Sequence, residues 1–326
     1  MEIKIDKIKN IVLLGGGKLL LDLARWAKSE YGIEVLVISS PRHSKEAIES
    51  NKTLENILKK ENIKFIIVDD IKSKEVKNNT EYLTDTFYLS IGSAWIFSED
   101  IINNLFNGKL FNLHGTRLPQ NRGGGGFSWQ IMMGNRLGFC QLHLIDGGID
   151  TGNIVKTEEF LYPPACRIPK DYEEIYVKKN WEFVTNFIKD IKESGIVTQT
   201  QKQQEYLSSY FPRLNTFEHG WIDWNYYVSE LERFICAFDD PYTGAKCLWG
   251  NKIVSLKKVS IDFSDQSFHP FQFGIVYRKN KDWLSICANG GTLIVEALRD
   301  ENNLSLLEEI IIGDKLFTNL SKLDSR

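Results

Sequence analysis

The densest group of residues able to do chemistry lies between Asn112 and Gly152. Asn112 and His114 are two positions apart, so on an extended segment both side chains point to the same side. Asp150 follows 36 residues after His114, within a glycine-rich turn. An amide, an imidazole and a carboxylate together suit general acid–base chemistry and the stabilisation of an oxyanion. The sequence therefore predicts a catalytic set made of Asn112, His114 and Asp150.

Two glycine-rich loops flank these residues. Residues 115–126 contain five glycines, and four of them are consecutive. Such a loop lets backbone N–H groups come close to a ligand. The second loop, residues 146–152, carries Asp146 as well as Asp150, and we interpret Asp146 as a turn former rather than a second base.

Strands and helices must position these residues, and they alternate through the N-terminal half. The apolar runs that predict strands are residues 11–14, 35–38, 65–68, 87–89 and 110–114. Helical spacing between such runs predicts a Rossmann-like, mostly parallel sheet with helices on both faces, an α/β fold. Ligands of these sheets bind beyond the carboxyl ends of the strands, which is where Asn112 and His114 lie on their predicted strand.

Three further patterns complete the expected organisation. Residues 140–144 alternate apolar and polar side chains, which predicts a strand with one covered face. A long helix is expected over about residues 171–192, and another over about 227–238. After them, short apolar runs at close spacing predict a smaller β-rich domain resembling an OB barrel. We expect a catalytic domain at 1–198, a linker at 199–205 and the β-rich domain at 206–326.

Composition indicates a soluble, cytoplasmic globular protein. Charged residues make up 25% of the chain and hydrophobic residues 42%, and the net charge of −3 disfavours a surface that coats nucleic acid. No apolar run approaches the roughly 20 residues that a membrane span requires. Five scattered cysteines suit reduced thiols, and no His/Cys cluster in the sequence predicts a metal site.

The motifs resemble those of the 10-formyltetrahydrofolate-dependent formyltransferases. Residues 112–114, followed by 118–119 and 122–123, are similar to the signature of that family, and residues 146–152 are similar to its downstream element. Two ordered motifs at a similar separation are more specific than either motif alone. In the second half, Gly220–Trp224 and Arg233–Ala245 resemble the C-terminal domain of two-domain members. The sugar N-formyltransferases of two domains are the most similar members.

The resemblance implies three sets of functional residues. The catalytic set is Asn112, His114 and Asp150. The set implied for the folate is Ser90, Ile91, Gly92, Leu118, Pro119, Phe139, Asp146 and Gly147. The set implied for the acceptor is Arg117, Arg122, Gly124, Gly125 and Lys170, in which a basic residue would meet a diphosphate.

The implied reaction is attack of a neutral primary amine on the formyl carbon of 10-formyltetrahydrofolate, without a metal. His114 would begin as an imidazolium that hydrogen-bonds the oxyanion, and Asn112 would donate its amide N–H to the same oxygen. Asp150 would keep His114 protonated and accept the amine proton through a water.

The acceptor is expected to be an amino sugar linked to a nucleotide, of the kind used for lipopolysaccharide O-antigens and other surface glycans. A tRNA-binding domain needs basic residues, whereas residues 211–326 carry 13 lysines and arginines against 16 aspartates and glutamates. After Arg122 and Gly123, residues 124–127 (Gly-Gly-Gly-Phe) replace the small residues and proline of the family pattern, in a loop that borders the acceptor in the family. Methionyl-tRNA formyltransferase, a 10-formyltetrahydrofolate hydrolase and a non-catalytic binding module remain alternatives. A homodimer is possible.

Overall fold

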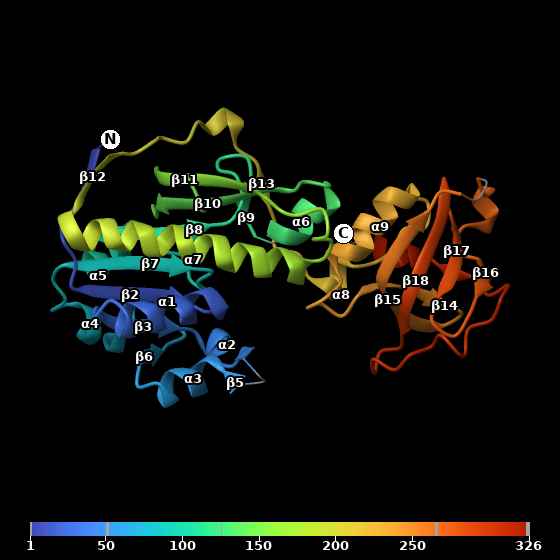
Figure 1. Ribbon diagram of the computed structural model, residues 1–326, viewed down its shortest axis with the longest axis horizontal. Helices are drawn as coiled ribbons and strands as arrows, with labels where there is room; N and C mark the ends of the chain where they lie inside the picture. Colours follow the sequence, from blue (N-terminus) through green and yellow to red (C-terminus); the bar gives the residue numbers. More distant parts are fainter. Residues whose placement is uncertain (1, 50–51, 125, 265–266, 324–326) are drawn as a thin grey trace. The chain divides into compact units, whose positions relative to one another are not determined.

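A seven-stranded sheet organises the first part of the chain in the computed structural model (Figure 1). The structure describes residues 2–49, 52–124, 126–264 and 267–323. Across the sheet the strands are β11 (Ile154–Leu161), β10 (Leu137–Leu144), β8 (Leu110–His114), β7 (Thr86–Ile91), β2 (Asn10–Gly15), β3 (Glu34–Ser39) and β6 (Lys64–Ile67). The run from β8 to β6 is parallel, and β10 pairs with β8 in the antiparallel direction.

Helices pack on both faces of this sheet. The helices of the chain are α1 (Gly17–Ser29), α2 (Pro41–Ser44), α3 (Leu54–Lys60), α4 (Lys74–Thr80), α5 (Glu99–Phe106), α6 (Gly126–Met132), α7 (Pro169–Ser194), α8 (Thr216–His219), α9 (Val228–Ala237) and α10 (Leu320–Leu323). Leu13 of β2 packs with α1, α3 and α7, while Leu14 packs with α4 and α5. Successive residues of β2 point to opposite faces, which explains why the whole run is apolar.

The turn from β2 to α1 depends on glycine. Gly15 has a positive φ of 125°, and a Cβ there would lie 2.1 Å from the carbonyl oxygen of Ile91. Gly15 ends β2 and Gly17 begins α1, so these glycines form a tight strand-to-helix turn. The spacing of these glycines matches neither the dinucleotide-binding pattern nor the P-loop pattern.

The second part of the chain contains a six-stranded antiparallel sheet. In order, its strands are β16 (Val276–Lys279), β17 (Leu284–Ala288), β18 (Gly291–Arg299), β15 (Lys252–Asp262), β14 (Ala245–Trp249) and β19 (Leu316–Phe317). A bridge between Ile275 and Lys315 joins the ends of the two edge strands, so the sheet curls toward a barrel. The predicted fold, a Rossmann-like sheet followed by a smaller β-rich domain, is confirmed.

Shorter strands complete the description: β1 (Glu2–Ile5), β4 (Ala47–Glu49), β5 (Lys52–Thr53), β9 (Arg122–Gly123), β12 (Ile196–Gln199) and β13 (Tyr210–Phe211). The chain divides into two compact units. The first comprises Met1–Gly123, Leu137–Phe160 and Ile175–Tyr210, and the second comprises Gly124–Arg136, Leu161–Glu174 and Phe211–Arg326. Within the described residues, every helix is too short or too polar to cross a membrane.

One strand differs from its prediction. The alternation at residues 140–144 predicts one covered face, but β10 is buried on both faces, and Gln141 and His143 are 3% and 1% exposed. Both polar side chains have partners: Gln141 Oε1 accepts the Leu118 N–H, and both ring nitrogens of His143 lie near polar atoms. Buried polar groups are tolerated where such partners exist, so alternation alone does not predict an exposed face.

Candidate active site

Asn112 and His114 occupy the carboxyl end of β8, as predicted. β8 lies between β7 and β10, and its register places Asn112 opposite Ser90 on one side and His143 on the other. Two residues further along, His114 is opposite Gln141. Because parallel strands end at a common edge, the polar side chains of β8 are presented there with those of its neighbours.

The hydrogen bonds of His114 fix its tautomer. Nε2 lies 2.7 Å from the carbonyl oxygen of Asn121 and 2.7 Å from Oγ1 of Thr116, which itself donates to the same carbonyl. A carbonyl oxygen only accepts, so we assign the proton of the neutral ring to Nε2. Nδ1 then carries the lone pair, and it faces Oδ2 of Asp150 at 3.8 Å.

Asp150 is held in an unusual backbone conformation. Its φ is 54°, in the left-handed region that few non-glycine residues adopt. The Gly123 N–H donates to its carboxylate at 2.9 Å, and Gln203 Nε2 donates to the carbonyls of Asp150 and Gly152 at 2.8 and 2.7 Å. A local strain that several contacts maintain is typical of functional sites.

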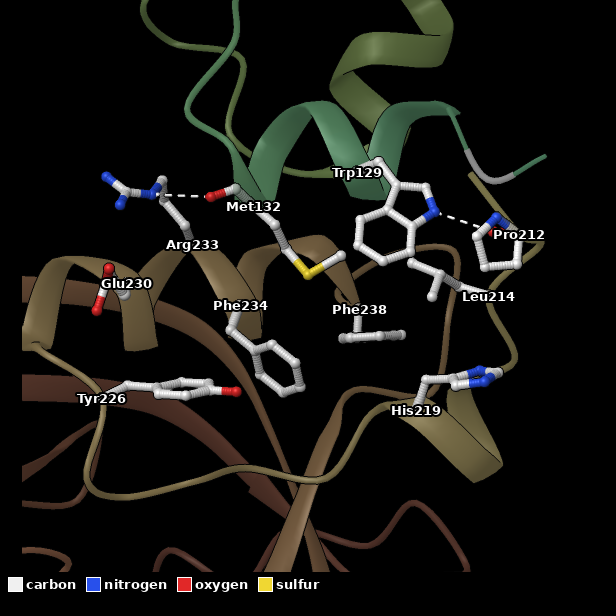
Figure 2. Close-up of a pocket in the computed structure, with 10 residues that line it drawn as sticks. All are labelled: Trp129, Met132, Pro212, Leu214, His219, Tyr226, Glu230, Arg233, Phe234 and Phe238. Carbon is white, nitrogen blue, oxygen red and sulfur yellow. Dashed lines mark hydrogen bonds between the residues drawn. The ribbon is translucent and has the colours of Figure 1, made fainter. Parts of the chain in front are cut away.

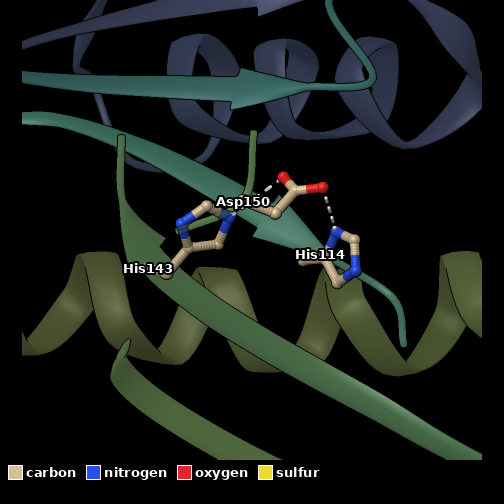
Figure 3. A group of neighbouring side chains, drawn as sticks. All are labelled: His114, His143 and Asp150. Atoms are coloured by element: carbon tan, nitrogen blue, oxygen red, sulfur yellow. Dashed lines mark ion pairs between the residues drawn. The ribbon is translucent and has the colours of Figure 1, made fainter. Parts of the chain in front are cut away.

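His143 joins the predicted catalytic residues, as Figure 3 shows. Its Nδ1 lies 2.8 Å from the Leu144 carbonyl, so Nδ1 carries the proton and Nε2 is an acceptor. Nε2 is 3.0 Å from Nδ2 of Asn112, which donates to it, and 3.6 Å from Oδ1 of Asp150. Its contacts with Asn112 and Asp150 indicate that His143 supports the site.

Burial dominates the electrostatics of the site. It lowers the pKa of His114 from its ordinary value of 6.5, and the nearby Asp150 opposes this only in part. Burial would raise the pKa of Asp150, but His143, His114 and the Gly123 N–H outweigh it and hold this pKa at about 2. At neutral pH the carboxylate is therefore ionised and the His114 imidazole is mostly neutral.

The residues implied for the folate lie in the first unit. Ser90 is the last residue but one of β7, lies opposite Asn112, and donates to Ser93 Oγ at 3.1 Å. Gly92 has a φ of 59°. Phe139 and Ile91 are buried. The Leu118 N–H donates to Gln141, and the Pro119 carbonyl accepts from Ser209. Asp146 accepts from the Gly148 N–H and from Thr151 Oγ1, so its carboxylate shapes the turn that includes Gly147. Folate contacts for these residues stay predictions.

The residues implied for the acceptor have different surroundings. Arg117 is exposed and makes no ion pair with any residue that the structure describes. Arg122 is 6% exposed, and its guanidinium donates to Gln203 and Glu205. Gly124 and Lys170 belong to the second unit, where their N–H groups donate to the carbonyls of Phe211 and Asp240. Gly125 lies outside the described residues.

Sequence reasoning missed two contributors to the site. Gln203, which falls in the predicted linker, donates two hydrogen bonds to the loop that carries Asp150. The Asn121 carbonyl orients His114, and no side-chain pattern identifies a backbone acceptor. The structure also brings His114, His143 and Asp150 into one group whose ligand atoms could surround a cation, although the sequence showed no such cluster.

The second unit has a pocket of about 470 Å³ with aromatic walls (Figure 2). Phe234 and Phe238 are buried there, and Trp129 Nε1 donates to the Pro212 carbonyl while Arg233 Nε donates to the Met132 carbonyl. Of the residues implied for the folate or the acceptor, those that the structure describes do not line this pocket.

Comparisons with known proteins agree with these motifs. A family model described as the C-terminal domain of formyl transferases matches residues 216–310. The methionyl-tRNA formyltransferase of Clostridium tetani is 20% identical over 309 residues, which cover 94% of this chain and 97% of that protein. The chain is therefore similar to formyltransferases over nearly its whole length, and its second half carries a match to their C-terminal domain.

Solved structures of other formyltransferases share the fold. WlaRD, a sugar 3N-formyl transferase solved with dTDP and 5-N-formyl-THF, has a TM-score of 0.64 at 21% identity, over 91% of this chain and 99% of that one. The N-formyltransferase from Helicobacter canadensis, solved with folinic acid and dTDP-3-aminofucose, has a TM-score of 0.64 at 20% identity, over 89% and 99%. The names of these relatives divide between a tRNA enzyme and sugar enzymes, so they do not decide an acceptor for this chain.

Proposed function

We propose that this chain transfers a formyl group from 10-formyltetrahydrofolate to the primary amine of a nucleotide-linked amino sugar. One observation carries the proposal of formyl transfer: an ionised Asp150 lies 3.8 Å from the lone-pair nitrogen of a neutral His114, beside the amide of Asn112. This arrangement can accept a proton and stabilise an oxyanion in the same place.

Asn112 is suited to the oxyanion that forms when the amine attacks the formyl carbon. Its Nδ2 carries two N–H groups, and His143 accepts one of them. The second N–H is directed at the substrate oxygen in our proposal. Loss of a comparable donor costs about 3 kcal/mol in other enzymes.

His114 acts as the proton acceptor in the proposed mechanism. The bond from the amine nitrogen to the formyl carbon forms, and the resulting ammonium gives its proton to Nδ1 of His114. Asp150 stabilises the imidazolium, which then protonates the departing folate nitrogen as the old carbon–nitrogen bond breaks. This differs from the expectation that His114 begins as an imidazolium, because burial lowers its pKa.

A compact anionic acceptor suits the distribution of charge. Arg117 follows His114 closely in the chain and is exposed, which favours it over the engaged Arg122 as the partner of a diphosphate. Residues 211–326 are acidic on balance, with 13 basic and 16 acidic residues. The two structures with a TM-score of 0.64 are sugar enzymes solved with a dTDP compound, which supports the same choice. The product would serve surface glycans such as O-antigens, made from nucleotide sugars in the cytoplasm.

Methionyl-tRNA is the second candidate acceptor, because the relative from Clostridium tetani carries that name. The direct test offers 10-formyltetrahydrofolate together with a panel of nucleotide-linked amino sugars and, separately, charged initiator tRNA. We expect formylation of at least one sugar. Formylation of tRNA alone would overturn the choice of acceptor, and release of formate without any amine would indicate a hydrolase.

The catalytic set has its own test. His114→Ala and Asp150→Ala should each abolish most turnover while folate binding, followed by fluorescence titration, stays measurable. Near-normal turnover of either variant would contradict the proposed mechanism whatever the acceptor is.

A further inference from the structure

His114, His143 and Asp150 have the geometry of a three-residue metal site. His114 Nδ1 lies 3.8 Å from Oδ2 of Asp150, His143 Nε2 lies 3.6 Å from Oδ1, and the ligand atoms are all within 4.8 Å of one another. A tetrahedral zinc ion with bonds of about 2.1 Å needs ligand atoms about 3.4 Å apart. Small side-chain rotations would therefore close this group around one ion.

The two imidazoles are already in the tautomers that a metal requires. The Nε2–H of His114 donates a hydrogen bond to the Asn121 carbonyl at 2.7 Å, and the Nδ1–H of His143 donates one to the Leu144 carbonyl at 2.8 Å. The remaining lone pairs, on His114 Nδ1 and His143 Nε2, both face Asp150. Histidine ligands in metal sites are commonly oriented by a backbone carbonyl in this way.

The chemistry and burial of the group favour zinc. The side chains of His114, His143 and Asp150 are 10%, 2% and 16% exposed. Two imidazoles and one carboxylate suit Zn²⁺, whereas Mg²⁺ prefers oxygen ligands and retains its waters. An ion at this place replaces the Asn112 hydrogen bond to His143, and Asn112 has a second N–H.

We propose that this group binds one Zn²⁺ ion and that the bound ion inhibits the chain. The ion occupies Nδ1 of His114, the atom that accepts the amine proton in the mechanism above. Inhibition therefore rests on the proposed function, whereas binding depends only on the three side chains. The site makes the chain sensitive to free zinc, and a chelator reverses the effect.

Binding is measured on the metal-free full-length chain, by competition for Zn²⁺ with a chromophoric chelator and by the visible spectrum of added Co²⁺. We expect one ion per chain, no displacement by excess Mg²⁺, and an intense Co²⁺ spectrum typical of low coordination number. His143→Leu and Asp150→Asn should each weaken binding at least tenfold, and His219→Gln, which removes a histidine elsewhere, should not. Unchanged affinity in both site variants, or a Co²⁺ spectrum of the hexa-aqua type, would refute the site.

Folding of the variants is followed by thermal denaturation. Zn²⁺ should raise the midpoint of the wild-type chain and of His219→Gln, because a ligand that binds the folded state stabilises it. A similar rise in folded His143→Leu would count against the site.

Inhibition is measured on formyl transfer with the acceptor that the screen identifies. Half-maximal inhibition should occur at the same free Zn²⁺ concentration as half-maximal binding, EDTA should restore turnover, and the residual turnover of His143→Leu should tolerate at least tenfold more zinc. Binding without inhibition, or activation by zinc, would overturn the inhibitory role. If the chain transferred no formyl group at all, the binding experiments would still decide whether the site exists.

Discussion

Replacing Asp150 with asparagine tests the proposed proton transfer most directly. Asparagine keeps the size of the side chain, tolerates the φ of 54°, and retains an oxygen that can accept the Gly123 N–H. The substitution removes the negative charge that faces Nδ1 of His114 and puts an NH2 group in place of the oxygen near His143. The loss should therefore appear in the step that places a proton on that nitrogen.

The distance between the two groups sets the size of the effect. Unit charges 3.8 Å apart interact by about 4 kcal/mol at an effective dielectric constant of about 20. The imidazolium exists after the proton has moved and not in the resting chain, so this energy lowers the barrier rather than the ground state. Its loss corresponds to about a 10³-fold decrease in kcat.

Steady-state assays that follow tetrahydrofolate release give kcat and the KM for each substrate. We expect kcat to fall about 10³-fold in Asp150→Asn, with the KM for the folate changed little. Asp239→Asn is the matched control, because Asp239 is a buried carboxylate that accepts the Lys258 N–H at 2.7 Å in the second unit. If Asp150→Asn kept kcat within tenfold of the wild type, the charge of Asp150 would have no part in the rate-limiting step and the mechanism would be wrong.

Three more outcomes are expected. His143→Leu removes the acceptor that positions the Asn112 amide, so kcat should fall about tenfold, as for the loss of one neutral hydrogen bond. His143→Gln should restore part of this loss. Equal losses of kcat in the two variants would argue against a role of His143 in positioning Asn112. In buffer with EDTA, kcat/KM should decline as the pH falls through the pKa of His114, which burial places below 6.5. Asp150→Asn should move this decline to still lower pH. If kcat/KM declined instead as the pH rose through this range, the result would favour a His114 that begins as an imidazolium. Gln203→Ala should lower the free energy of unfolding by about 1–3 kcal/mol, because Gln203 donates to two carbonyls of the Asp150 loop. An unchanged denaturant midpoint would show that these two hydrogen bonds do not stabilise the loop.

The layered fold was predictable because burial on both faces leaves a strong signal. A strand such as β2 must be apolar at every position, and the glycines that follow it mark the turn to α1. The strands that were not predicted lack that signal. β1 pairs with β12 across almost 200 residues of chain, Glu2 being opposite Gln199, and no local pattern encodes such a pairing.

The candidate site was predictable only in part, for a related reason. Asn112 and His114 lie on one strand, and their spacing alone places both side chains on one side. His143 comes to Asn112 through the register of β10 against β8, and Gln203 comes to the Asp150 loop from the far end of the first unit. The positions of His143 and Gln203 depend on tertiary contacts between distant parts of the chain. The sequence therefore shows that these residues are polar but not which residues they contact.

Two backbone carbonyls explain how one group of side chains can serve both proton transfer and metal binding. The carbonyls of Asn121 and Leu144 each accept a hydrogen bond from the N–H of one imidazole, and both remaining ring nitrogens face Asp150. A lone pair beside a carboxylate is a good place for a proton, and for the same reason it is a good place for a cation. A site that accepts a proton in this way will therefore also attract a metal cation, unless its ligand atoms are too far apart to share one ion. Here these atoms lie within 4.8 Å of one another, which is close enough. Zinc sensitivity is then a consequence of how the imidazoles are oriented, which is why His143→Leu should weaken metal binding more severely than it slows formyl transfer.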